Sequence, residues 1–166
     1  MTRPNINQLV DALRAEFTVR IELPTGAVEK EQLFVELPAD HAGRARQLEL
    51  VFLPDDDGVH FLQYFVALPY AIKQERLGDL ARLINRINAT SPLIGFGLIE
   101  DLPLACFRCV VPCPNRTLDT TILSHTLYVV LYIIDQLGAI VEAVGGGTVT
   151  LADAVAQLAA VPEHHV

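Results

Sequence analysis

Three cysteines that lie close together in the sequence are the first candidates for chemistry. Cys106, Cys109 and Cys113 follow the spacing C-x2-C-x3-C and precede Pro114, in outline like the runs that hold zinc or iron–sulfur clusters. Such sites need four ligands, and no histidine lies nearby to supply the fourth. If residues 104–111 form a strand, Cys106 and Cys109 point to opposite faces of its sheet and cannot hold one ion. We therefore expect buried core thiols, no metal and no cofactor.

Two further motifs could carry catalysis, but neither has the context that catalysis requires. Residues 145–148 read Gly-Gly-Gly-Thr, yet they lack the lysine of a phosphate-binding loop and the strand that should precede it, so we expect a helix stop. Ser124 neighbours His125, but adjacent helical residues diverge by about 100° and cannot act as a nucleophile and its base. We therefore expect that the protein is not an enzyme.

One stripe of polar and aromatic residues is a candidate for binding. Its members recur at intervals of three and four, which places them on one face of a helix. They are His125, Tyr128, Tyr132, Asp135, Ala139 and Glu142. Tyrosines combine apolar area with a polar tip, which suits an interface with another protein. The stripe could line a groove, form a symmetric contact between two copies, or be the solvated side of a buried helix.

Charge and hydropathy narrow the class of partner. The chain has 166 residues, of which twenty are acidic and twelve basic, for a formal net charge of −8. Without a cationic stripe to neutralise phosphates, we expect no nucleic-acid partner. Charged side chains from Arg3 to Arg20 argue against a signal peptide. The longest clean apolar run, Leu127–Ile134, would span about 12 Å as a helix, against about 30 Å of bilayer. We expect a cytoplasmic protein that does not enter a membrane.

Apolar periodicity predicts the elements that position these residues, and it indicates an α+β domain. Helices are expected over 6–17, 75–89, 118–144 and 150–160, and strands over 31–37, 46–53, 59–68, 93–99 and 104–111. The order is α-β-β-β-α-β-β-α plus a C-terminal helix, and runs of strands between helices indicate an antiparallel sheet. A polar turn is expected at 54–58. We expect one domain at 1–144, followed at 145–166 by a glycine hinge, the last helix and a tail.

The third predicted strand is apolar on both sides. Phe61, Phe65 and Ala67 lie on one face, and the other face carries the residues Leu62, Tyr64, Val66 and Leu68. Helices can cover one face of the sheet, so we expect the last helix, a second subunit or a bound peptide to cover the other. Phe61 and Phe65 therefore join the helical stripe as candidate protein-binding residues.

The order of elements and two segments resemble a known family. They are the helix Leu77-Gly-Asp-Leu-Ala-Arg-Leu-Ile-Asn-Arg-Ile-Asn88 and the hairpin Gly95-Phe-Gly-Leu-Ile-Glu100 with Leu104-Ala-Cys-Phe-Arg108, followed by the long helix. They are similar to the YbjN-like family, which shares the fold of type III secretion chaperones, over about residues 6–144. The resemblance implies a small, often dimeric, non-enzymatic domain that binds polypeptides or regulates. We therefore expect a homodimeric protein-binding or regulatory module; the alternative is a small-molecule sensor or enzyme with a pocket between the long helix and the sheet.

Overall fold

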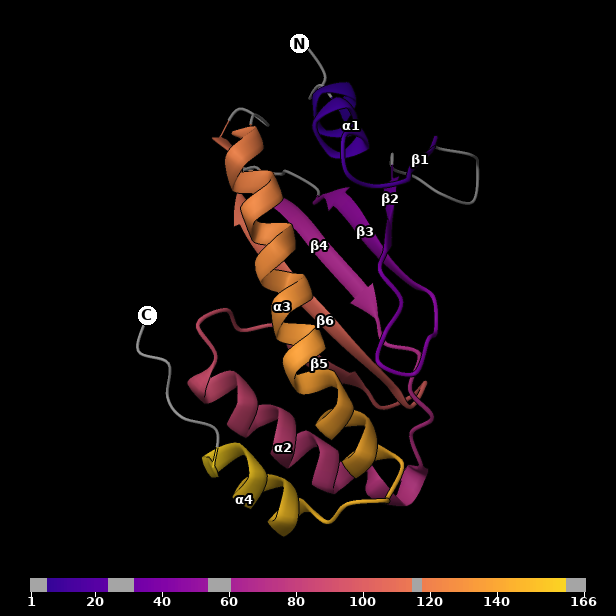
Figure 1. The fold of residues 1–166 in the computed structure, drawn as a ribbon, viewed down its shortest axis with the longest axis vertical. Helices are drawn as coiled ribbons and strands as arrows, with labels where there is room; N and C mark the ends of the chain where they lie inside the picture. The colour runs from indigo at the N-terminus through magenta and orange to yellow at the C-terminus, as the bar shows by residue number, and fades with distance from the viewer. Residues whose placement is uncertain (1–5, 24–31, 54–60, 115–117, 161–166) are drawn as a thin grey trace.

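The computed structural model describes residues 6–23, 32–53, 61–114 and 118–160. In this part of the chain, four helices lie on one side of a six-stranded antiparallel sheet (Figure 1). The strand order is β1-β2-β3-β4-β6-β5, so the last hairpin places its second strand beside β4 and leaves its first strand at the edge. The predicted turn at 54–58 and the tail at 161–166 lie outside the described residues.

The element order confirms the predicted α+β class. In chain order the elements are α1 (Ile6–Arg14), β1 (Val19–Glu22), β2 (Gln32–Leu37), β3 (Arg46–Phe52), β4 (Phe61–Ala67), the short 3-10 helix η1 (Gln74–Arg76), α2 (Leu77–Thr90), β5 (Phe96–Ile99), β6 (Leu104–Pro112), α3 (Thr120–Gly145) and α4 (Leu151–Ala160). All four predicted helices and all five predicted strands are present, with ends that differ by a few residues.

The strand β1 is an addition to the predicted order. It pairs with β2 along its whole length, from Val19 opposite Val35 to Glu22 opposite Gln32. Only four residues form it, and charged side chains alternate with its two apolar ones. Such a segment contains too few apolar residues to be distinguished from a polar connection by periodicity alone.

The core lies between the sheet and the helices, and alternate strand residues supply it as predicted. On β4, Leu62, Tyr64 and Val66 are buried on the helical side. The Tyr64 hydroxyl donates a hydrogen bond of 3.3 Å to the carbonyl oxygen of Leu123 in α3. The longest helix is therefore tied to the middle of the sheet by a polar contact inside an apolar core.

The helix α3 runs diagonally across the sheet (Figure 1). The carboxylate of Asp119 caps its start by accepting a 2.7 Å hydrogen bond from the Thr121 N–H. By length and composition alone this helix could cross a membrane, a test that core helices of soluble proteins also pass. Here its inner face is buried in the core, with Leu123, Leu127, Val130 and Ile134 among its fully covered residues.

The last helix does not cover the second face of the sheet. Instead α4 lies beside α2 on the helical side (Figure 1), where Ala154 is buried and Leu151 and Leu158 pack against the core. The turn that precedes it uses Gly147 with φ of +75°, a conformation that glycine adopts without steric cost. Of the three candidates to cover the second face of the sheet, the last helix is therefore excluded, and a second subunit and a bound peptide remain.

A glycine in the middle of α3 provides a test of the packing. A Cβ atom at Gly138 would lie 2.2 Å from the buried Tyr70 hydroxyl oxygen, whereas nothing lies within 4 Å of one at Gly78 in α2. Gly138→Ala should therefore lower the free energy of unfolding by about 1–3 kcal/mol. The control Gly78→Ala should raise it by about 0.5–1 kcal/mol through helix propensity. Urea unfolding measures both; equal stabilisation by the two variants would contradict the close contact.

Candidate functional site

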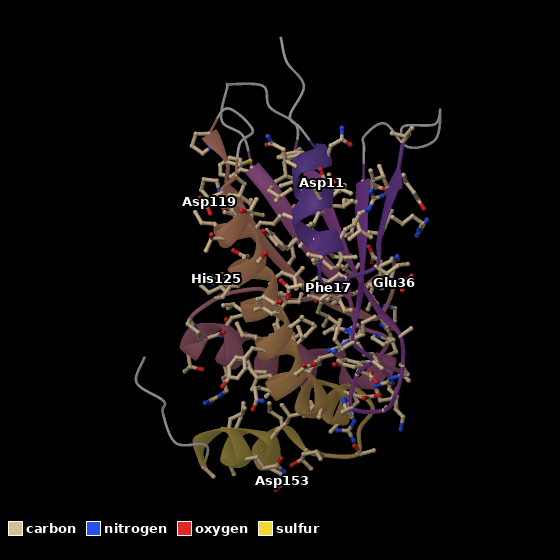
Figure 2. All side chains as sticks on the ribbon, turned by 45° about the horizontal axis from the view of Figure 1, so that its top comes forward. Asp11, Phe17, Glu36, Asp119, His125 and Asp153 are labelled. Carbon is tan, nitrogen blue, oxygen red and sulfur yellow. The ribbon has the colours of Figure 1, made fainter. Side chains whose placement is uncertain are left out.

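The predicted stripe on α3 is exposed in its N-terminal part and joined there by apolar residues that the sequence did not single out. Tyr128 and Tyr132 are 42% and 59% exposed, and Ile122 and Val129 are 49% and 41% exposed. Figure 2 shows His125 on the outside of the same helix. We call these five residues the exposed α3 face. It holds half of the large apolar side chains that are exposed among the described residues.

One tyrosine of this face is anchored to the rest of the protein. The ring centroid of Tyr128 lies 6.2 Å from that of Phe17, which follows α1 and packs against the core. Tyr132 has no such ring contact within the described chain and projects further into solvent. The exposed α3 face therefore offers one fixed aromatic ring and one ring with more freedom.

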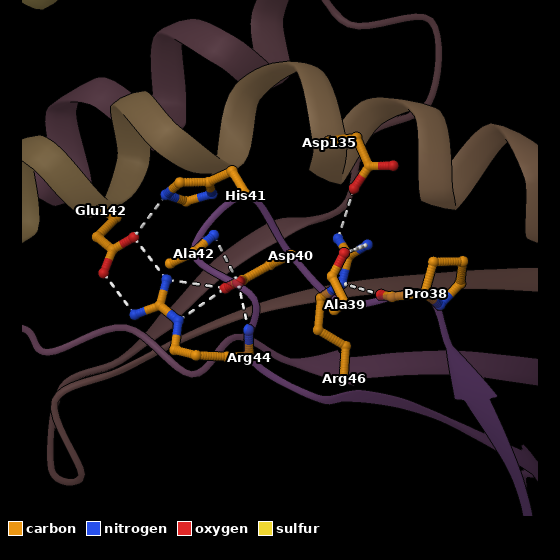
Figure 3. A network of polar contacts seen from close by, with 9 residues as sticks. All are labelled: Pro38, Ala39, Asp40, His41, Ala42, Arg44, Arg46, Asp135 and Glu142. Atoms are coloured by element: carbon orange, nitrogen blue, oxygen red, sulfur yellow. Dashed lines mark hydrogen bonds and ion pairs between the residues drawn. The ribbon is translucent and has the colours of Figure 1, made fainter.

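The C-terminal part of the stripe is used inside the protein. Asp135 accepts a 2.6 Å hydrogen bond from Nη1 of Arg46, whose side chain is only 1% exposed (Figure 3). Nε of Arg46 donates to the carbonyl oxygen of Pro38 at 2.9 Å. A buried guanidinium needs a counter-charge, and Asp135 supplies it to Arg46, the first residue of β3, while its own side chain stays half exposed.

Arg44 forms a second ion-pair cluster about two turns further along α3, at Glu142. Its guanidinium binds both oxygens of Glu142, at 2.6 and 2.7 Å, and Nε donates to Oδ2 of Asp40 at 2.8 Å (Figure 3). His41 Nε2 lies 3.0 Å from Oε2 of the same glutamate. The Arg44 guanidinium also stacks over the ring of Tyr70, 5.3 Å from its centroid.

These contacts change how the carboxylates titrate. Hydrogen bonds from Arg44 hold the pKa of Glu142 below its ordinary value. Burial would raise the pKa of Asp40, but hydrogen bonds from Arg44 and the Ala42 N–H outweigh it, so that pKa also lies below its ordinary value. Both groups are therefore carboxylates at neutral pH. Together with the Arg46–Asp135 pair, they attach the C-terminal half of α3 to the β2–β3 loop and to the start of β3. We call these two ion-pair groups the ion-pair clamps.

The sequence offers little signal for these clamps. Arg44 and Glu142 are 98 residues apart in the chain, and Arg46 and Asp135 are 89 apart. No local spacing rule connects residues at such separations. The nearest available signal is that Asp40, Arg44 and Arg46 crowd a short connection between two apolar strands.

Cys106 and Cys109 lie on opposite faces of the sheet, as the alternation of side chains along a strand predicted. Cys109 faces the helices opposite Tyr64, whereas Cys106 faces the other side of the sheet, opposite Gly97. All three cysteines are buried. Burial raises the pKa of Cys109 to about 11 and also raises that of Cys106, so both remain thiols at neutral pH. Within the described ranges, no group of three or more His, Cys, Asp or Glu side chains could hold a metal ion.

The face of the sheet away from the helices is a mixed surface. One cross-strand row places Arg20, Phe34, Glu49, Phe65 and Arg108 side by side on five strands. Phe61 and Phe65 are half-buried there. This face is thus less apolar than β4 alone predicted, because charged residues of the neighbouring strands flank its phenylalanines.

Two hollows among the described residues border side chains discussed above. A hollow of about 250 Å³ lies between the β2–β3 loop and α3, lined by Asp40, His41, Arg46 and Asp135 among others. A second, of about 500 Å³, crosses β5 and β6 on the open face and includes Cys106. His125 and Tyr128 lie outside both. A small-molecule pocket between the long helix and the sheet stays a prediction.

A comparison with protein families finds one match. The model of the YbjN family, described as "Putative bacterial sensory transduction regulator", matches residues 27–142. The matched segment contains both ion-pair clamps and the exposed α3 face, whereas α1, β1 and α4 lie outside it. Among curated proteins, none matches the chain. The likeness to the fold of type III secretion chaperones stays a prediction.

The Arg44 cluster predicts a pH dependence of stability. Because the folded pKa values of Asp40 and Glu142 lie below the ordinary 3.8 and 4.5, their stabilising effect is complete above those values and is lost as the pH falls through the folded ones. The melting temperature should therefore drop progressively as the pH falls below about 5. At pH 7 the Arg44→Met variant should have a lower melting temperature than the wild type. Its melting temperature should also fall less steeply as the pH is lowered.

The matched control is Arg82→Met, because the Arg82 side chain is 76% exposed on α2. Its pH profile should follow that of the wild type. Parallel profiles for Arg44→Met and the wild type, measured by circular dichroism, would contradict the assignment of this pH dependence to the cluster.

Proposed function

Because the chain belongs to the YbjN family, we propose that it is a regulatory protein that acts by binding a polypeptide, without catalysis. The partner docks on the exposed α3 face. The family description supports a role in signal regulation, and the surface of the helix supports the mode of action. The net charge of −8 favours a neutral or basic partner over an acidic one.

The observation that carries this proposal is the composition of the exposed α3 face. Its four large apolar side chains are contiguous on one side of one helix and are each more than 40% exposed. Single exposed apolar residues are common on proteins, but a contiguous group points to an interaction surface. Two of the four are tyrosines, which are enriched among the residues that dominate binding energy.

The ion-pair clamps support the same proposal because they hold this surface in place. Arg44 and Arg46 fix the C-terminal half of α3, and the Tyr64 hydroxyl fixes its N-terminal half to the sheet. A surface that is already ordered loses little conformational entropy when a partner binds. The exposed α3 face is therefore a preformed site.

Further parts of the proposal concern the setting in which the protein acts. We infer a homodimer, a cytoplasmic location, and partners that include neither nucleic acid nor a membrane surface. Three buried cysteines suit a reducing compartment. The half-buried rings of Phe61 and Phe65 on the open sheet face form a second, smaller candidate contact, and Asp135 acts by positioning α3.

Affinity purification from a native extract tests the main proposal. The tagged wild type should retain a specific polypeptide that mass spectrometry identifies, and Val129→Glu combined with Tyr132→Glu should reduce its recovery by about tenfold or more, because a charge is buried where apolar area was. Arg82→Glu on α2 is the control and should retain the partner. Both variants change exposed positions, so circular dichroism should show an unchanged fold. Equal recovery from all three proteins would contradict the proposed face.

A further inference from the structure

The two edges of the sheet are treated differently by the protein. At the β5 edge, the side chain of Asn88 in α2 bonds both backbone groups of Phe96. Its Nδ2 donates to the Phe96 carbonyl oxygen at 2.8 Å, and the Phe96 N–H donates to its Oδ1 at 3.1 Å. At Phe96 a carboxamide thus occupies the place where another strand would pair, and covering backbone groups of an edge strand is one way that proteins protect it.

The β1 edge has no such protection among the described residues. The Glu36 N–H donates to the carbonyl oxygen of Thr18 at 2.9 Å, so even-numbered residues of β1 direct their backbone groups toward β2. Val19 and Ile21 therefore direct an N–H and a carbonyl away from the sheet. No hydrogen bond within the described chain reaches these four groups.

The sequence of this edge is complementary to itself. It reads Val19-Arg-Ile-Glu-Leu23, with an apolar residue at each end and in the middle and opposite charges between them. We propose that β1 pairs with β1 of a second copy, antiparallel and about a twofold axis at Ile21, which joins two sheets into one. This inference rests on the homodimer in the proposed function and is independent of the exposed α3 face.

The register follows from charge and hydrogen bonding together. A twofold axis at Ile21 places Arg20 opposite Glu22 of the second copy, and Val19 opposite Leu23. An axis at Arg20 would instead place two arginines directly opposite each other, which is unfavourable. In the chosen register, the outward backbone groups of Ile21 lie opposite those of Ile21 in the second copy. The outward backbone groups of Val19 lie opposite those of Leu23, another odd-numbered residue, in the second copy.

The side chains at this edge gain from the pairing on both faces of the sheet. Leu23 is 64% exposed, and the second copy's Val19 would cover it. On the open face, Arg20 pairs with Glu22 of its own chain and stacks 4.8 Å from the ring centroid of Phe34. Burial and the negative charge of Glu22 raise the pKa of Glu49, so an incoming arginine would meet two neighbouring carboxyl groups.

Charge exchange tests this register without altering the buried core. Sedimentation of the wild type should show a dimer whose population rises with concentration. Arg20→Glu and Glu22→Arg should each weaken it by about tenfold or more, because both change two attractive pairs into repulsive ones. An equal mixture of the two variants should dimerise again, since every pair across the edge is then opposite in charge. The double variant R20E/E22R should do the same.

Two controls make the same changes of charge elsewhere. Arg82→Glu on α2 and Glu100→Arg after β5 are exposed positions away from β1 and should leave the dimer unchanged. A wild type that stays monomeric at every concentration would overturn the inference. Pairing of its β1 edge with a strand of a different protein, in place of a second copy, would overturn it as well. So would a dimer that the exchanges do not weaken, or a mixture that does not recover.

The failures of the two proposals can be told apart. A monomeric wild type that still retains its partner through Tyr132 and Val129 would overturn the β1 contact and leave the exposed α3 face supported. A dimer that responds to the charge exchange, combined with no retained polypeptide, would support the β1 contact and overturn the exposed α3 face as a binding site.

Discussion

The position of α3 depends on one electrostatic constraint, the burial of the Arg46 guanidinium beneath it. A buried cation without a counter-charge costs several kcal/mol, so the helix must bring Asp135 to that place. Arg44 and Glu142 repeat the arrangement further along the same helix. Two points of attachment define both the direction and the rotation of α3 about its axis. Which of its residues face the core and which face solvent follows from that rotation.

The division of α3 into an attached half and an exposed half is a result of the same constraint. Its C-terminal half uses its polar residues to bind the β2–β3 loop, and Gly138 lets Tyr70 approach closely enough to support that loop. Its N-terminal half has no comparable loop above it in the described structure, so Ile122, Val129 and Tyr132 stay exposed. The attached half and the exposed half are thus parts of one continuous helix.

Much of the fold could be predicted because its signals are local. Alternation in β2 and β4 and helical spacing in α2 report burial directly, whereas β1 is too short and too charged for such a signal. The helical spacing of Tyr128 and Tyr132 also identified an exposed face. Its apolar members could not be predicted, because an apolar residue of an apolar helix faces inward or outward only once the helix is placed. The mixed character around Phe65 likewise depends on strand neighbours that the sequence of β4 does not contain.

The contact between Asn88 and Phe96 has a consequence for aggregation. Unprotected margins at both sides of a sheet allow stacking of one molecule after another into a fibril. Here the carboxamide occupies the outward backbone groups of Phe96, so a further strand cannot pair with β5 at that residue. Growth through the sheet is therefore disfavoured at the β5 edge relative to the β1 edge.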